Sequence, residues 1–173
     1  MQKRRAKRTA HVVRSGDREL REHLAYLLKG GGAHVHFEDA VDGFPARKRG
    51  VFAKGLPHTG WQLLEHMRLA QWDILEFSCD AKHVSPPFPG GYWPKTPVPP
   101  SDSAWDKSVR EFKRDLNELI KLVKNPRNDL AAKFPWGDGQ TILREALLAA
   151  DHNAYHLGEL VYLRRALGAW PDS

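Results

Sequence analysis

Residues 141–167 read TILREALLAADHNAYHLGELVYLRRAL. We interpret this stretch as one long α-helix, with Gly168 as a candidate C-cap because glycine readily adopts the left-handed conformation that ends a helix. The helix carries two histidines, His152 and His156, four residues apart. On an α-helix this spacing places both side chains on one face, one turn from each other, with Cβ atoms about 5–6 Å apart. Two imidazoles placed in this way can bind one divalent metal ion.

Three further long helices are predicted before this one. The first covers residues 17–29, where leucines recur at helical spacing and a run of glycines follows. The second covers residues 59–78 and the third covers residues 101–124, and each begins at a threonine or serine that serves as an N-cap. A short helical turn is expected at residues 37–41. Because no strand pattern competes, we predict an all-α fold, a single-domain four-helix bundle with long connecting loops.

One connection, residues 84–100, contains seven prolines, a density that excludes a helix or a central strand. It also contains Phe88, Tyr92 and Trp93, and a disordered linker does not usually retain such bulky aromatic side chains. We therefore predict an ordered loop that lies over the helices and walls a pocket. The alternative, a loop that only covers the core, stays open.

The composition is that of an ordinary globular protein. The chain has 173 residues, of which 41% are hydrophobic and 28% charged, and this length suits one compact domain. A single cysteine, Cys79, excludes a disulfide-stapled secreted fold and a cysteine-rich zinc finger. Because no apolar run is long enough to span a membrane and no secretory signal is recognised, we expect a cytoplasmic protein without a membrane partner. Exposed apolar helix faces could also support a homodimer.

The net charge of +6 comes from the beginning of the chain. The first 16 residues hold six of the 27 lysines and arginines and no acidic residue, so the remainder of the chain is electrically neutral. We predict a basic, flexible N-terminal tail over residues 1–16 and a helical domain over residues 17–173. A neutral domain lacks the basic face that supplies most of the affinity of a DNA-binding protein, so we expect no dedicated nucleic-acid surface. Weak contact of the tail with phosphates or anionic lipid is the alternative.

A three-histidine metal site needs a third ligand from another helix. His66 lies midway along the predicted helix at residues 59–78, and packing of two helices can bring it against His152 and His156. A less specific interpretation has weight, because the chain holds nine histidines and one pair at this spacing arises easily by chance. A lone buried histidine is also more often a hydrogen-bonded core residue than a ligand, and others, such as His83, look like surface residues. From spacing alone, both interpretations stay open.

Two helices of the chain resemble those of a known family. The resemblance lies in WQLLEH at residues 61–66 and AQWDI at residues 70–74 of one helix, and in DHNAYHLGE at residues 151–159 of the last helix. These segments are similar to those of the DinB-like proteins, including the YfiT-type metalloenzymes, which share a superfamily with thiol-dependent transferases. The resemblance covers residues 20–170, and the basic tail lies outside it.

The resemblance implies a four-helix bundle that binds one divalent metal ion, zinc or nickel, through His66, His152 and His156. Members with known activity transfer low-molecular-weight thiols or are mycothiol-dependent isomerases. We therefore expect a metal-dependent enzyme that acts on a small-molecule substrate, with a low-molecular-weight thiol as the candidate cosubstrate. Two reactions suit such an ion, activation of a thiol for attack on an electrophile and hydrolysis by an activated water. A non-catalytic metal-binding or accessory protein of the same fold is the main alternative.

Several further residues are candidates for the chemistry. Glu159, Tyr155 and Asp73 lie near predicted ligands along their helices, and each could act as a general base or hold an imidazole N–H. An ordinary surface or packing role is the alternative for each of them. Four aromatic or imidazole side chains are candidates for lining a substrate pocket: His58, Trp61, Tyr92 and Trp93.

Overall fold

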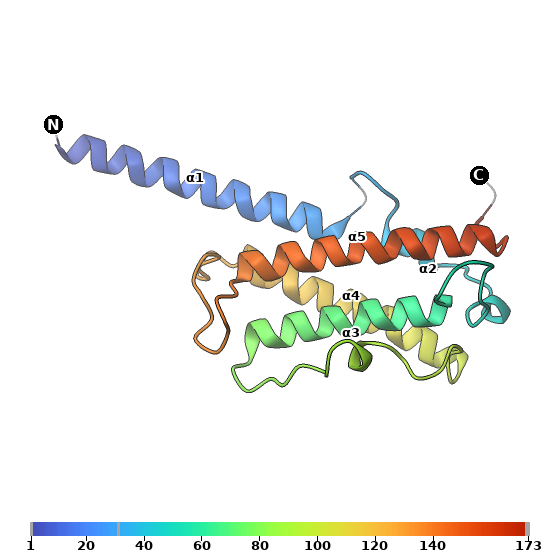
Figure 1. Cartoon of the computed structure of the whole chain (residues 1–173). Helices are drawn as coiled ribbons and strands as arrows, with labels where there is room; N and C mark the ends of the chain where they lie inside the picture. The colour runs from blue at the N-terminus through green and yellow to red at the C-terminus, as the bar shows by residue number, and fades with distance from the viewer. Residues whose placement is uncertain (1, 31, 172–173) are drawn as a thin grey trace.

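The computed structural model describes the backbone of residues 2–30 and 32–171 and, within these ranges, the side chains from residue 16 onward. In this part of the chain the protein is all-helical, with no strand beyond a single bridge between Lys133 and Thr141. The predicted all-α class is confirmed. The elements, in chain order, are α1 (Gln2–Lys29), α2 (Phe37–Val41), the 3₁₀-helix η1 (Ala46–Lys48), α3 (Gly60–Cys79), the 3₁₀-helix η2 (Gly90–Tyr92), α4 (Asp102–Lys124) and α5 (Ile142–Ala166) (Figure 1).

The helix α1 is longer than the sequence analysis predicts. The predicted start at residue 17 is wrong, because the helix begins at Gln2. The residues before Gly16 are rich in lysine, arginine and alanine, which favour a helix, and a single glycine inside a helix costs only about 1 kcal/mol. In Figure 1 the first half of α1 extends beyond the ends of the other helices. The basic side chains of the predicted tail lie outside the described side chains, and the division into residues 1–16 and 17–173 stays a prediction.

The other long helices begin where their sequence predicts. At each N-cap a hydroxyl accepts a hydrogen bond from the backbone N–H three residues further on, which satisfies one of the free N–H groups at a helix start. The predicted bounds of α2, α3, α4 and α5 are confirmed to within a residue. The cap pairs are Thr59 with Gln62 in α3, Ser101 with Ala104 in α4 and Thr141 with Arg144 in α5.

The long helices pack around two hydrophobic clusters. α3 contacts both α4 and α5, and α1 contacts the same two helices. One cluster joins α1, α3, α4 and α5 around Leu119 and Ala146. The other joins α2, α3, α4 and α5 around Trp105 and Leu160. Among the described residues, no helix combines the length and the apolar character needed to cross a membrane.

A buried amide network fixes how α3, α4 and α5 meet. Asn153 on α5 donates to Gln71 on α3 at 2.6 Å, and Gln71 donates in turn to the backbone carbonyl of Phe112 on α4 at 2.7 Å. Because Gln71 is only 1% exposed, leaving its amide unpaired would cost about 1–3 kcal/mol. Sliding α3 along α5 would break these hydrogen bonds, so the network favours one register between the two helices.

The proline-rich connection between α3 and α4 is an ordered loop that runs along α3 (Figure 1). It contains η2, and the hydroxyl of Thr59 donates to the backbone carbonyl of Pro97 at 2.6 Å. This hydrogen bond joins the start of α3 to the end of the loop. The prediction of an ordered loop over the helices is confirmed.

We expect Thr59→Ala to destabilise the protein more than Thr141→Ala. Both substitutions remove an N-cap, which costs about 1 kcal/mol. Thr59→Ala also leaves the carbonyl of Pro97 without this donor, so urea denaturation should give a total loss of about 2 kcal/mol. Thr59→Ser keeps the hydroxyl and should stay close to the wild type. Equal losses for the two alanine variants would contradict a stabilising link to Pro97.

Candidate metal centre

Three histidine side chains meet between α3 and α5. His66 lies in the middle of α3, and His152 and His156 lie one turn apart on α5. The Nε2 atom of His66 is 3.0 Å from Nε2 of His156 and 3.0 Å from Nε2 of His152, and the three candidate ligand atoms all lie within 4.8 Å of one another. Two nitrogens bound to one zinc ion in a tetrahedral site are about 3.3 Å apart. The predicted convergence is confirmed, and these residues could hold a metal ion.

Aromatic rings cover one side of this cluster. His66 is 8% exposed, and the ring of Trp93 from the proline-rich loop stacks on it at 3.9 Å with 2° between the planes. The ring of His58 stacks on Trp93 at 4.0 Å. The rings of His58, Trp93 and His66 thus form one continuous stack. The stacking holds the imidazole of His66 in one orientation and shields it from water.

Hydrogen bonds on the far side of two imidazoles determine where their protons lie. Nδ1 of His66 is 2.9 Å from the backbone carbonyl oxygen of Tyr92, and since a carbonyl can only accept, Nδ1 carries the hydrogen. Nδ1 of His156 is 2.7 Å from Oε2 of Glu159, and by the same argument it donates to that carboxylate. Partners of this kind orient metal-binding histidines. In the neutral rings both Nε2 atoms therefore keep a lone pair directed into the cluster.

Two lone pairs that face each other at 3.0 Å repel, and a cation between them would relieve this repulsion. Burial opposes a protonated His66, because it lowers the pKa of this ring to about 4. Burial, helped by the neighbouring imidazoles, also lowers the pKa of His152 to about 4. These two rings are neutral near pH 7, which is the form of imidazole that binds a metal ion. The donor set is thus chemically suited to a divalent cation.

Asp73 contacts the loop over the cluster. One carboxylate oxygen accepts a hydrogen bond from the hydroxyl of Tyr92 at 2.7 Å, and the other lies 2.7 Å from Nε2 of His83. Burial and this carboxylate raise the pKa of Tyr92 to about 12, so the hydroxyl stays protonated and remains a donor. Asp73 therefore steadies the residue whose backbone carbonyl holds His66, and the imidazole that it binds belongs to His83 rather than to a candidate ligand.

The two remaining catalytic candidates lie against His156. Glu159 accepts from Nδ1 of this ring and so holds an imidazole N–H, as one of its two predicted roles requires. Tyr155 is 65% exposed, and its ring lies edge-on to that of His156 with centroids 4.9 Å apart. Tyr155 is therefore a surface residue that covers the outer side of His156.

The structure separates Trp61 from the other candidates for substrate binding. His58, Tyr92 and Trp93 lie at the cluster, whereas Trp61 is 5% exposed and belongs to the hydrophobic core. Trp61 is in the first turn of α3, where its backbone N–H donates to the carbonyl of Arg49 at 2.8 Å. This turn packs against the preceding segment, and Trp61 lines neither of the two cavities near the cluster.

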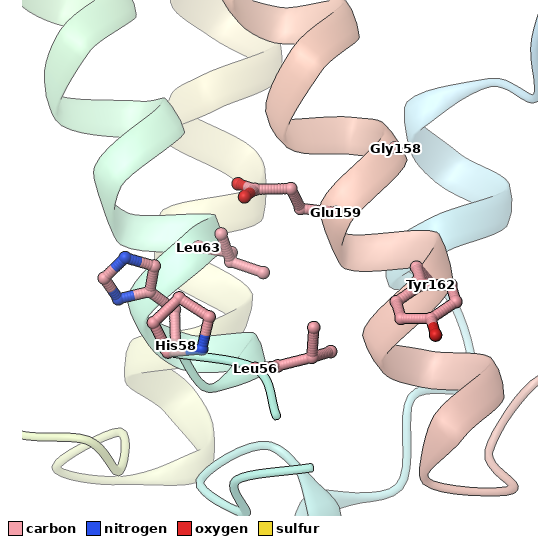
Figure 2. A pocket seen from close by; sticks show the side chains of 7 residues that line it. Leu56, His58, Leu63, Gly158, Glu159 and Tyr162 are labelled. Atoms are coloured by element: carbon pink, nitrogen blue, oxygen red, sulfur yellow. The ribbon is translucent and has the colours of Figure 1, made fainter. Parts of the chain in front are cut away.

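Among the described residues, two cavities have walls close to the three candidate ligands. One, of about 190 Å³, is lined by His66, His152, Asp73 and Tyr92 together with apolar side chains, and we call it the ligand cavity. The other, of about 260 Å³, is lined by Glu159, His58 and apolar residues, and we call it the Glu159 cavity (Figure 2). The first therefore reaches two candidate ligands directly, and the second reaches the carboxylate that holds His156.

Two of these residues, His83 and Tyr162, were not predicted from the sequence. The expectation that His83 lies on the surface is wrong, because its side chain is 9% exposed and is bound to Asp73. The residue follows the end of α3, and only the path of the loop brings it back, so helical spacing gives no signal. Tyr162 lines the Glu159 cavity and lies three residues after Glu159, a spacing that could have identified it.

Comparison with protein-family models, with curated proteins and with solved structures finds no match to this chain. The resemblance to the DinB-like proteins therefore stays a prediction. The features that favour a metal centre are instead the convergence of three histidines, the Nδ1 partners of His66 and His156, and the burial of His66.

The free energy of unfolding of the metal-free protein should fall as the pH falls from about 6.5 to about 4. In this window the unfolded chain binds protons on His66 and His152, whose ordinary pKa is 6.5, while the folded state does not until about pH 4. The loss should be at most about 1.4 kcal/mol per pH unit for each ring. Urea denaturation at several pH values measures it. His152→Gln should show a shallower slope and the exposed control His23→Gln an unchanged one; parallel slopes for all three proteins would contradict the burial argument.

Glu159→Ala should weaken zinc binding about 10- to 100-fold, because the substitution removes the carboxylate that orients His156. Competition with a zinc-binding dye of known affinity measures the change. Asp151→Ala is the matched control, since it removes an exposed carboxylate from the same helix next to His152. Equal effects of the two substitutions would indicate a general electrostatic contribution instead of a specific hydrogen bond.

Proposed function

We propose that this protein is a divalent-metal-dependent enzyme that acts on a small molecule, by thiol transfer or by hydrolysis. The single observation that supports the proposal most is the convergence of three Nε2 atoms, two of which are held as lone-pair donors by Tyr92 and Glu159. We further propose that the helices form a DinB-like four-helix bundle, as the resemblance implies. A possible partner is a second copy of the chain, and a low-molecular-weight thiol is the proposed cosubstrate.

His66, His152 and His156 would hold the ion. Three neutral imidazoles leave a divalent ion its full charge and leave room for a further ligand, as in catalytic zinc sites. Zinc and nickel are the proposed ions, because both accept imidazole ligands. When bound, the ion supplies Lewis acidity, which lowers the pKa of a water or thiol that it coordinates and polarises a carbonyl group.

The residues around the ligands would position them and control access. Glu159 and the backbone carbonyl of Tyr92 hold the Nδ1 protons of two ligands and so fix their tautomers. The hydrogen bond from Tyr92 to Asp73 keeps the loop in place over α3. Trp93 excludes water from one face of His66. A substrate would approach through the ligand cavity, which reaches His66 and His152.

The main alternative is a metal-binding protein without catalysis. The ligand cavity favours an enzyme over this alternative, because a purely structural metal is usually enclosed by four protein ligands. Binding of nucleic acid through the basic side chains of residues 1–16 is a further alternative. The structure does not describe these basic side chains. Such binding would be sensitive to salt and would disappear when residues 1–16 are deleted.

Alanine substitution of any one of the three histidines should remove stoichiometric metal from the purified protein. Elemental analysis of His66→Ala, His152→Ala and His156→Ala measures the effect, with the exposed His23→Ala as control. We expect helical circular dichroism to be unchanged, since the two hydrophobic clusters do not include the ligands. Unchanged metal content in the three variants would overturn the metal centre. Calorimetry of the zinc-loaded protein with cysteine as the probe then tests thiol binding.

A further inference from the structure

The Glu159 cavity is a second pocket beside the candidate metal centre. Its volume is about 260 Å³, slightly below the range of pockets that bind drug-sized molecules, about 300–1,000 Å³. Figure 2 shows its walls, with Leu56 and His58 from the segment before α3, Leu63 from α3, and Tyr162 from α5. None of the three candidate ligands lines it in the part of the chain that the structure describes. The pocket is therefore distinct from the ligand cavity.

Glu159 is the one carboxylate among the residues that line this pocket. In Figure 2 its side chain extends from α5 toward α3 and ends above Leu63. One oxygen, Oε2, accepts from His156, while Oε1 has no hydrogen-bond partner in the described part of the chain. A carboxylate oxygen can only accept, so a molecule that satisfies Oε1 must bring a donor.

The remaining lining residues leave Glu159 without a competing cation. Burial lowers the pKa of His58, so this imidazole is neutral near pH 7. Leu56, Pro57 and Leu63 supply apolar surface. The pocket thus combines an apolar wall with one carboxylate acceptor, and such placed polar groups fix the orientation of small ligands in binding sites.

Gly158 opens the pocket on the side of α5. A Cβ atom added to Gly158 would meet no atom within 4 Å, so the glycine leaves free space where any other residue would place a side chain. Glycine inside a helix costs about 0.5–1 kcal/mol relative to alanine. Gly158 is exposed and lines the pocket, so a larger side chain at this position has room beside it.

We propose that the Glu159 cavity binds a small molecule with an apolar body that ends in a hydrogen-bond donor, and that Oε1 of Glu159 accepts this hydrogen bond. The inference goes beyond the proposed function, since it assigns the chemical class of a second ligand beside the candidate metal centre. The same carboxylate holds Nδ1 of His156, so the bound molecule lies within two hydrogen bonds of a candidate metal ligand.

Two alcohols and their methyl ethers test this assignment. Benzyl alcohol and cyclohexylmethanol carry a donor on an apolar body, while their methyl ethers keep the body and lose the donor. Ligand-observed NMR on the metal-free full chain should give at least about tenfold tighter binding for each alcohol, the difference expected for a hydrogen bond to a charged group. In Glu159→Gln the amide can donate to the ether oxygen, so the preference should shrink to about threefold or less.

Filling the pocket provides the second arm of the experiment. Gly158→Leu should weaken binding of both alcohols at least tenfold, because the new side chain occupies the open space. Gly158→Ala leaves most of the volume and should retain binding, and Ala166→Leu places the same leucine side chain at an exposed position at the end of α5 as a control. Equal binding of alcohols and ethers to the wild type, or unchanged binding in Gly158→Leu, would overturn the inference.

The outcomes separate this inference from the proposed function. Probe binding is measured without metal, and zinc content is measured independently on the same variants. Equal binding of alcohols and ethers to a wild-type chain that still binds zinc would overturn the Glu159 pocket alone. A chain that binds the alcohols but no metal would overturn the metal-dependent enzyme and leave the pocket standing.

Discussion

The register between α3 and α5 is the constraint on which the site depends. The buried amides of Gln71 and Asn153 hydrogen-bond to each other, and Gln71 is tied to the backbone of α4 as well. Hydrophobic packing alone tolerates small shifts between helices, whereas a buried amide loses its partner when the helices slide. Asn153 is adjacent to His152 in the chain, and Gln71 follows His66 by five residues. The register that pairs the amides is thus the one in which the three histidines meet.

The proline-rich loop fixes the orientation and the tautomer of His66, which the packing of α3 and α5 leaves open. Helices can bring imidazoles together, but they do not decide which ring nitrogen carries the proton. At His66 the loop determines the position of the proton through the backbone carbonyl of Tyr92, and the stacked ring of Trp93 fixes the orientation of the imidazole. Asp73 on α3 accepts a hydrogen bond from the hydroxyl of Tyr92, and this bond fixes the loop to the helix that carries His66. The prolines limit the backbone freedom of a segment that must hold this position without a regular ladder of hydrogen bonds.

Features that depend on neighbouring residues, such as the helix starts, could be predicted from the sequence. Contacts between segments that are distant in the sequence could not. The caps at Thr59 and Thr141 mark the helix starts because capping involves neighbouring residues only. The pair on α5 and its convergence with His66 followed from helical spacing and from the family resemblance. The burial of Trp61 could not be predicted, since spacing does not distinguish a core face from a pocket face. The predicted start of α1 is wrong because a basic terminus without acidic residues suggests a flexible tail, although its lysines, arginines and alanines also favour a helix.

The histidine cluster contributes less to stability than its burial suggests. Three imidazoles in apolar surroundings give up hydration, and in the metal-free protein two of their nitrogens direct lone pairs at each other. Hydrophobic side chains at these positions would pack without that cost. The surrounding hydrogen bonds from Tyr92 and Glu159 nevertheless hold the rings in this unfavourable arrangement. Such an arrangement would become favourable with a cation at the point where the lone pairs meet, and these three residues could hold one.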